Sequence, residues 1–253
     1  MASDQVRAVG VGRGRGKSIQ PNFDAPLRRP TADSQGSYDS LDKEEFGPVK
    51  IDTIEKITQG IKSSAALRSF TDILVERAVS SRNFGENLLM KVKELTSFTV
   101  EDKKFRTVFL SSIQSKFKEM EVILKINQNH YANFIFFMKE CIKHLRMPND
   151  DPITALVNAF LELIPAALKP GITLEMAIVI RESMFSLFDD LWKFASPKCE
   201  EVLEDARELV IKNSFDMKIG NELLFLAEIV HYRCSGDIPS FLLTYYKEKG
   251  LKF

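Results

Sequence analysis

From about Asp52 onward, apolar side chains recur at the three- and four-residue spacing of an α-helix, and this periodicity constrains the fold most. Phe70, Leu74 and Ala78 mark one such stripe, and similar stripes follow to the end of the chain. No stretch carries the apolar and polar alternation that is typical of a β-strand. The sequence therefore predicts an all-α fold.

Turn signals divide the periodic region into roughly nine or ten helices with short connections. Residues 105–124 are predicted to form one long helix. Asp151 and Pro152 are predicted to provide the cap and the first turn of another helix, because proline is well tolerated at that position. Stacked antiparallel pairs, an α-solenoid, suit this many helices, and a single globular bundle is the alternative.

The later boundaries are predicted from local signals as well. The Pro-Gly pair that ends at Gly171 breaks the chain, and Thr173 is predicted to cap a helix that extends as far as Trp192. Pro197 is predicted to open the next helix and Asp237 to cap the last one.

Residues 1–46 differ in composition from the rest of the chain. They are rich in glycine and proline and poor in aliphatic residues, so they cannot bury enough apolar surface to offset the loss of conformational entropy. We expect a disordered arm over 1–46, with Gly47 and Pro48 at its border, and a helical domain over 47–253. The arm is basic in its first part and acidic in its second part.

The arm contains a short arginine–glycine stretch with Arg13, Arg15 and Lys17. Flexible glycines would allow these cations to reach phosphates, so they are candidate RNA contacts; a plain solvated tail is the competing interpretation. Gly16, Lys17 and Ser18 match the end of a phosphate-binding loop, but Val11 stands where that motif needs its first glycine. No alternation of strand and helix follows, and a nucleotide site is not expected.

Charge and composition exclude several classes of protein. Lys+Arg and Asp+Glu both number 35, so the chain as a whole does not attract nucleic acid, and RNA binding would need a local patch. One such patch would be a basic stripe along a single helix. Its candidates are Lys103, Lys104, Arg106, Lys116 and Lys118, although helical spacing does not place all of them on one face.

No catalytic or metal site is expected. Cys141 and His144 lie three residues apart, but a structural zinc ion usually needs four ligands, and Cys141 belongs to an apolar stripe. Glu200 and its acidic neighbours resemble a solvated helix face. We therefore expect a protein that is not an enzyme and has no cofactor. Three cysteines, no signal-peptide pattern and no apolar run of about 20 residues favour the cytoplasm or the nucleus, away from a membrane.

The last third of the chain holds the candidates for partner contact. Glu228 and Arg233 lie on one predicted helix, five residues apart, and therefore do not face each other squarely. Arg233 stands near the end of that helix, where capping of carbonyl groups is an alternative role. Tyr245 and Tyr246, on the following helix, complete the set of candidate partner contacts.

The segment Leu223–Arg233 is similar to the closing helix of the middle domain of eukaryotic translation initiation factor 4G. Residues 154–158 and 107–109 also fit that family, and the resemblance extends from about Asp52 to the end of the chain. The family often has tryptophan four residues after the arginine, where this chain has Asp237. That departure puts in doubt any partner contact made through the tryptophan.

The resemblance implies a solenoid of about five HEAT-like antiparallel helix pairs that acts as an adaptor in messenger RNA translation. The implied partners are translation initiation factors, a DEAD-box RNA helicase or messenger-bound proteins; the weak RNA contact expected of the arm comes from its arginines and glycines. A small adaptor is implied, like the stem-loop-binding-protein interactor or the poly(A)-binding-protein-interacting proteins, and a homodimer is compatible with it. Direct RNA binding by the solenoid and an adaptor role outside translation are the alternatives.

Overall fold

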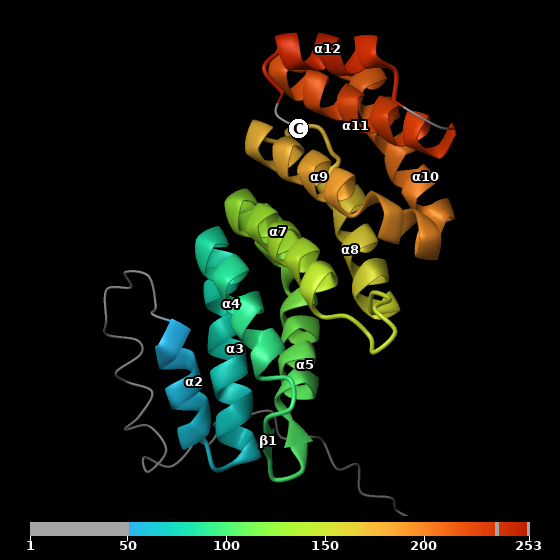
Figure 1. Cartoon of the computed structure of the whole chain (residues 1–253). Helices are drawn as coiled ribbons and strands as arrows, with labels where there is room; N and C mark the ends of the chain where they lie inside the picture. Colours follow the sequence, from blue (N-terminus) through green and yellow to red (C-terminus); the bar gives the residue numbers. More distant parts are fainter. Residues whose placement is uncertain (1–50, 236–237, 252–253) are drawn as a thin grey trace, which may run out of the picture. The chain divides into compact units, whose positions relative to one another are not determined.

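The computed structural model describes residues 51–235 and 238–251, and Figure 1 shows that most of this part is helical. The chain divides into two compact units, Met1–Glu45 and Phe46–Phe253, and every described residue belongs to the second. The predicted arm and its border at Gly47 and Pro48 lie outside the described residues.

The described residues form eleven helices, which confirms the mostly helical class. The helices, in chain order, are α2 (Ile51–Gly60), α3 (Ser64–Ser80), α4 (Arg82–Glu94), α5 (Phe105–Phe117), α6 (Met120–Ile126), α7 (Gln128–His144), α8 (Thr154–Ala167), α9 (Leu174–Ser186), α10 (Phe188–Lys212), α11 (Met217–Ser235) and α12 (Ser240–Glu248). In the part of the chain that the structure describes, no helix is both long and apolar enough to span a membrane.

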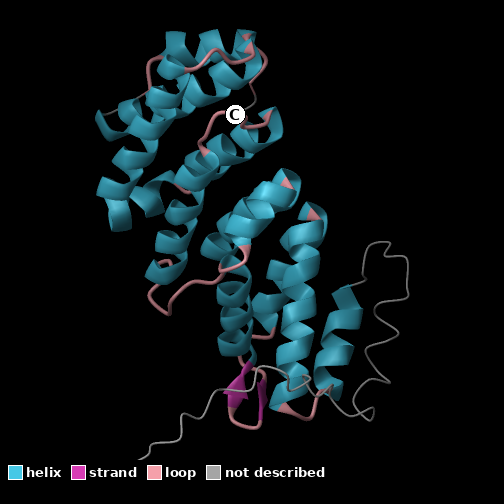
Figure 2. Ribbon diagram, turned by 180° about the vertical axis from the view of Figure 1, so that it is seen from behind, coloured by secondary structure: helices cyan, strands magenta, loops and turns pink. Residues whose placement is uncertain are grey.

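A small hairpin between α4 and α5 was not expected from the sequence. Strands β1 (Thr99–Val100) and β2 (Lys103–Lys104) pair antiparallel, and Figure 2 shows them in magenta at the start of α5. Glu101 and Asp102 form the two-residue loop with φ angles of 47° and 63°, the positive values that a type I′ turn requires. Strands of two residues are too short to show an alternating pattern, which explains why the prediction missed them.

The hairpin also supplies a cap for α3. An Oε2 atom of Glu101 accepts a hydrogen bond of 2.9 Å from the backbone N–H of Ser64, and the Ser63 side chain accepts from the N–H of Ala66. The bond from Ser64 holds the pKa of the Glu101 carboxyl below its usual value. Two otherwise unpaired donors at the first turn of α3 are therefore satisfied.

Replacing Asp102 by glycine is expected to stabilise the protein by about 0.5 kcal/mol, because glycine adopts positive φ without a steric penalty. Thermal unfolding followed by circular dichroism measures the change. Glu101→Gly is the matched control: it also relieves positive φ but removes the carboxylate that accepts from Ser64, so it should stabilise less than Asp102→Gly or destabilise. Equal effects of the two substitutions would contradict the capping role.

Two predicted helices divide where the sequence shows no breaker. The helix expected over 105–124 ends at Phe117 and resumes at Met120 as α6. The helix capped by Thr173 ends at Ser186, and Leu187 separates it from α10, so Trp192 lies on the next helix. Neither break has a proline or glycine, and both predictions of continuous helices were wrong for this reason.

The start of α8 also differs from the prediction. The helix begins at Thr154, with Ile153 preceding it, while Pro152 forms an isolated bridge with Arg146. Asp151 instead accepts a hydrogen bond of 2.8 Å from the Nζ of Lys193. The Asp-Pro pair therefore ends the preceding loop and does not cap the helix.

Other local predictions are confirmed. The Thr173 side chain accepts a hydrogen bond of 3.2 Å from the N–H of Met176, as an N-cap should. Gly171 has a φ of 91°, which suits the break before this helix. Ala195 has non-helical φ and ψ of −154° and 39° and kinks α10 two residues before Pro197. The prediction for the last helix was wrong: it starts at Ser240 with Pro239 at the N-cap position, and Asp237, the predicted cap, lies outside the described residues.

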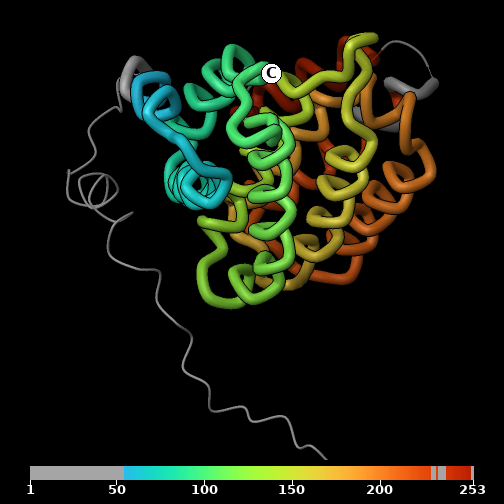
Figure 3. Tube along the Cα trace, turned by 90° about the horizontal axis from the view of Figure 1, so that it is seen from below, coloured from blue at the N-terminus to red at the C-terminus, as the bar shows by residue number. Residues whose placement is uncertain are grey.

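The helices follow one another across the unit roughly in chain order, as the colour gradient of Figure 3 shows, and much of the packing is between helices that are not consecutive. α7 packs against α4 and α9, and α9 packs against α11. On the other side of this row, α3 packs against α5, and α8 packs against α10. α5 and α8 do not pack closely against each other, so this second row is interrupted between them.

Polar bonds between side chains and backbone connect neighbouring helices. The hydroxyl of Tyr131 on α7 donates to the carbonyl of Leu163 on α8 at 2.8 Å. The Nδ2 of Asn133 donates to the carbonyl of Val79, at the end of α3, at 2.9 Å. α7 is therefore anchored on two sides, and its buried face forms the centre of the helical unit.

Candidate functional site

The predicted RNA contacts Arg13, Arg15 and Lys17 lie outside the described residues. Their role stays a prediction from the sequence. Arg233 lies on α11, but its side chain is also outside what the structure describes.

The structure brings together two of the predicted partner contacts. The hydroxyl of Tyr246 on α12 donates a hydrogen bond of 2.5 Å to Oε2 of Glu228 on α11. The Tyr246 ring meets Phe225 edge to face, with centroids 4.9 Å apart, and both side chains are buried. This placement gives Tyr246 and Glu228 a role in holding α12 on α11. Tyr245, by contrast, is 47% exposed.

The environment of Tyr246 keeps its hydroxyl protonated. Burial is the main cause that raises its pKa, and the neighbouring carboxylate of Glu228 raises it further. A neutral phenol is the form that can donate to Glu228. The bond therefore persists through the neutral pH range.

Removing the Tyr246 hydroxyl by Tyr246→Phe is expected to destabilise α12 by about 1–2 kcal/mol, since hydrogen bonds to charged groups are stronger than neutral ones. Hydrogen exchange of the α12 amides should accelerate by about tenfold while that of α7 stays unchanged. Tyr245→Phe is the matched control, because that side chain is exposed. If both variants exchange alike, the bond to Glu228 does not hold α12.

A buried ion pair joins α9 to α11, and the sequence analysis missed it. The Nε of Arg181 donates to Oε2 of Glu222 at 2.6 Å, and the side chains are only 4% and 8% exposed. The guanidinium also lies 5.5 Å from the centre of the Phe225 ring. An arginine inside the apolar run of α9 was the available signal, but its partner is 41 residues away in the sequence.

The structure also tests the basic stripe considered for α5. Lys116 forms ion pairs with Glu76 and Glu119, and Arg106 donates to the carbonyl of Arg146 at 2.7 Å. These two cations are engaged within the protein, whereas the side chains of Lys103, Lys104 and Lys118 are exposed. The five residues therefore do not form one continuous cationic surface.

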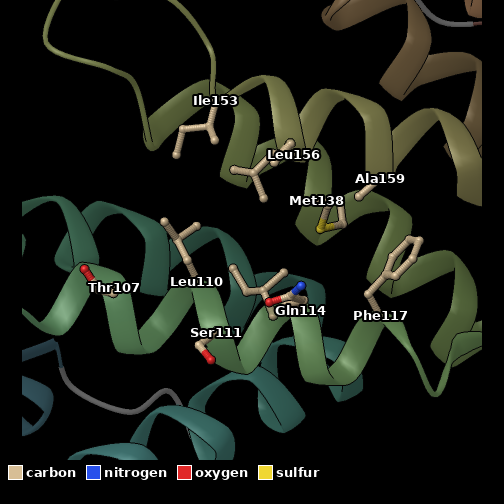
Figure 4. A pocket seen from close by; sticks show the side chains of 11 residues that line it. Thr107, Leu110, Ser111, Gln114, Phe117, Met138, Ile153, Leu156 and Ala159 are labelled. Atoms are coloured by element: carbon tan, nitrogen blue, oxygen red, sulfur yellow. The ribbon is translucent and has the colours of Figure 1, made fainter.

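A groove of about 470 Å³ lies where the second row of helices is interrupted. Figure 4 shows its two walls, α5 and α8, running in the same direction, with Met138 of α7 between them. The lining residues are Thr107, Leu110, Ser111, Ile113, Gln114, Phe117, Met138, Ile153, Ala155, Leu156 and Ala159. Most of them are apolar, and the polar ones come from α5.

Two features keep this groove open. The α8 wall has the small side chain of alanine at 155 and 159. The Ser111 hydroxyl accepts a hydrogen bond of 2.6 Å from Arg68 on α3, which ties the α5 wall to the side away from α8. Half-buried Leu110 and Phe117 consequently keep part of their apolar surface accessible. The volume is within the range of about 300–1,000 Å³ that is common for ligand pockets.

Cys141 lies in the core, as its place on an apolar stripe predicted. Cys141 is fully buried, and burial raises the pKa of its thiol well above the usual value, which makes a reactive thiolate unfavourable. The Nε2 of His144 lies 3.3 Å from Oε2 of Glu140, one turn away on the same helix. Among the described residues, no group of three His, Cys, Asp or Glu side chains is arranged to hold a metal ion.

Comparison with protein-family models and with curated proteins found no match for this chain. The resemblance to the initiation factor family therefore rests on the residues quoted for it.

Proposed function

We propose that this chain is a non-catalytic adaptor in messenger RNA translation. In this proposal its helices form an α-solenoid of about five HEAT-like antiparallel pairs. The packing of α7 on α4, of α9 on α7 and of α11 on α9 supports a repeating arrangement. The matching row, with α3 on α5 and α8 on α10, supports a second layer.

The observation that carries the adaptor role is the groove between α5 and α8. It has an apolar base at Met138 and Leu156 and a polar edge at Ser111 and Gln114. Such a combination suits the apolar side chains of a partner, whose backbone stays at the polar edge. A role in protein binding follows without any chemical step.

The assignment to translation is supported by the segment Leu223–Arg233 and by its likeness to the closing helix of the initiation factor family. In the structure this segment lies within α11, whose buried side chains include Leu223, Phe225 and Leu226. The proposed partners are translation initiation factors, a DEAD-box RNA helicase or messenger-bound proteins. The proposed location is the cytoplasm, with access to the nucleus.

Affinity purification of the full chain from cell lysate tests this proposal, with and without nuclease treatment. Recovery of initiation factors, a helicase or messenger-bound proteins after nuclease would support protein-mediated adaptor function. Recovery of these proteins only without nuclease would mean that RNA is the bridge and would favour direct RNA binding. Partners from an unrelated pathway would contradict the role in translation.

A further inference from the structure

The groove-facing stripe of α5 is bounded by a lysine at each end. Thr107, Leu110, Gln114 and other lining residues recur at helical spacing, so they share one face. Lys104 and Lys118 are the N-cap and C-cap residues of α5, so one lysine flanks each end of the helix that forms this wall. Both lysine side chains are exposed.

Among the described residues, these two lysines form no ion pair with a carboxylate, whereas the cation on the intervening helix does. Lys116 pairs with Glu76 and Glu119. On the opposite wall, Glu162 is already paired with Lys198, at 3.3 Å. The groove therefore has an apolar middle and a positive charge at each end of its α5 wall.

The separation of the charges sets the length of an occupant. With a rise of 1.5 Å per residue, α5 separates the α-carbons of its two flanking lysines by about 21 Å. A bound helix with carboxylates at both ends of a stretch of about 14 residues would match this distance. Apolar residues between those ends would meet the half-buried side chains of Leu110 and Phe117.

We propose that the α5–α8 groove binds a helical segment of a partner protein that is apolar on one face and acidic at both ends. Apolar side chains entering the groove would provide affinity, and the lysines would select acidic segments over basic ones. This inference rests on the proposed adaptor function and names the chemistry of its partner.

A selection from a displayed library of random 16-residue peptides on the immobilised full chain tests the proposal. Enriched peptides should carry leucine, isoleucine or aromatic residues at helical spacing and have a net negative charge. Fluorescence anisotropy of a labelled enriched peptide then gives its affinity for the full chain. Failure to enrich any such peptide, or enrichment of basic peptides, would overturn the proposal.

Substitutions that fill the groove locate the binding site. Ala155→Trp and Gln114→Trp place a large ring in the groove from exposed positions, so they leave the core intact. Each should weaken peptide binding by at least about tenfold. Val122→Trp is the matched control, since Val122 is 59% exposed on α6 and does not line the groove. Equal binding by all three variants would place the peptide elsewhere and overturn the proposal.

Neutralising the lysines tests the acidic part of the inference. Lys104→Gln together with Lys118→Gln should weaken binding of the acidic peptide by about three- to tenfold and reduce its dependence on salt. Replacing the acidic ends of the peptide by glutamine should give a similar loss with the wild-type chain and little further loss with the double variant. If the lysine substitutions and the peptide substitutions weaken binding additively, the carboxylates of the peptide do not meet these lysines.

Two further experiments distinguish a partner peptide from other occupants of the groove. Self-association in sedimentation that is lost in Ala155→Trp would assign the groove to a second copy and overturn the proposal. Displacement of the peptide by a uridine homopolymer would assign it to RNA, with the same consequence. Peptide binding does not depend on any translation component, so it can be detected even when the purification from lysate recovers no such component. A failure of this inference can therefore be distinguished from a failure of the proposed role in translation.

Discussion

Replacing Arg181 by methionine is expected to lower the free energy of unfolding by about 3–5 kcal/mol, because Glu222 would remain buried as an unpaired charge. The loss includes the hydrogen bond of 2.6 Å between the two side chains and the position of the guanidinium near Phe225. Denaturant unfolding followed by circular dichroism and by the fluorescence of Trp192, the single tryptophan of the chain, measures the change.

The double variant Arg181→Met with Glu222→Leu separates the cost of an unpaired charge from the net contribution of the pair. It should recover most of the loss and come within about 1 kcal/mol of the wild type, since apolar pairs often replace buried ion pairs without penalty. Lys212→Met is the control: Lys212 and Glu208 form an exposed pair, so its effect should stay within about 0.5 kcal/mol. If Arg181→Met lowers the free energy of unfolding by no more than Lys212→Met does, the buried pair does not contribute to stability.

Replacing Phe137 by alanine is expected to destabilise the protein by about 3–5 kcal/mol, the usual cost of a cavity left by a buried aromatic side chain. Phe137 is fully buried on α7, and its ring meets that of Phe109 edge to face with centroids 6.3 Å apart. The same denaturant unfolding measures the loss. Phe241→Ala, at a side chain that is 66% exposed, should change stability by less than about 0.5 kcal/mol.

Gly85 provides a second test of the packing around Phe137. A Cβ atom at Gly85 would lie 3.3 Å from Cδ2 of Phe137, which is closer than ordinary contact. Gly85→Ala should therefore be more favourable in the Phe137→Ala background, where the space is free and alanine gains about 1 kcal/mol of helix propensity. If Gly85→Ala has the same effect in both backgrounds, α4 does not rest on this ring.

The predicted contact residues show that helical periodicity in the sequence does not decide which side chains are free to contact a partner. Tyr245 and Tyr246 are adjacent tyrosines on one helix, and the sequence gives no reason to separate them. In the structure Tyr246 is buried against Phe225 and bonded to Glu228, whereas Tyr245 is exposed. Only the position of α11 beside α12 decides which of the two can reach a partner.

The groove could not be predicted for a similar reason. Its two walls are more than thirty residues apart in the sequence, and each wall carries an ordinary amphipathic stripe. The groove exists because α5 packs on α3 while α8 packs on α10, so their facing sides stay uncovered. Lys104 and Lys118 have a proposed role only because they flank the helix that forms one wall of this groove.

The sequence by itself determined the helical class, the cap at Thr173, the turn at Gly171 and the burial of Cys141. These features depend on backbone geometry and on periodicity within a few residues, so neighbouring residues in the sequence are enough to predict them. The tertiary structure alone decided the hairpin turn at Glu101, the breaks at Lys118 and Leu187, the Arg181–Glu222 pair and the groove. The ion pair and the groove depend on contacts between segments that lie far apart in the sequence, whereas the hairpin and the two breaks lack the alternating pattern, proline or glycine that would mark them in the sequence.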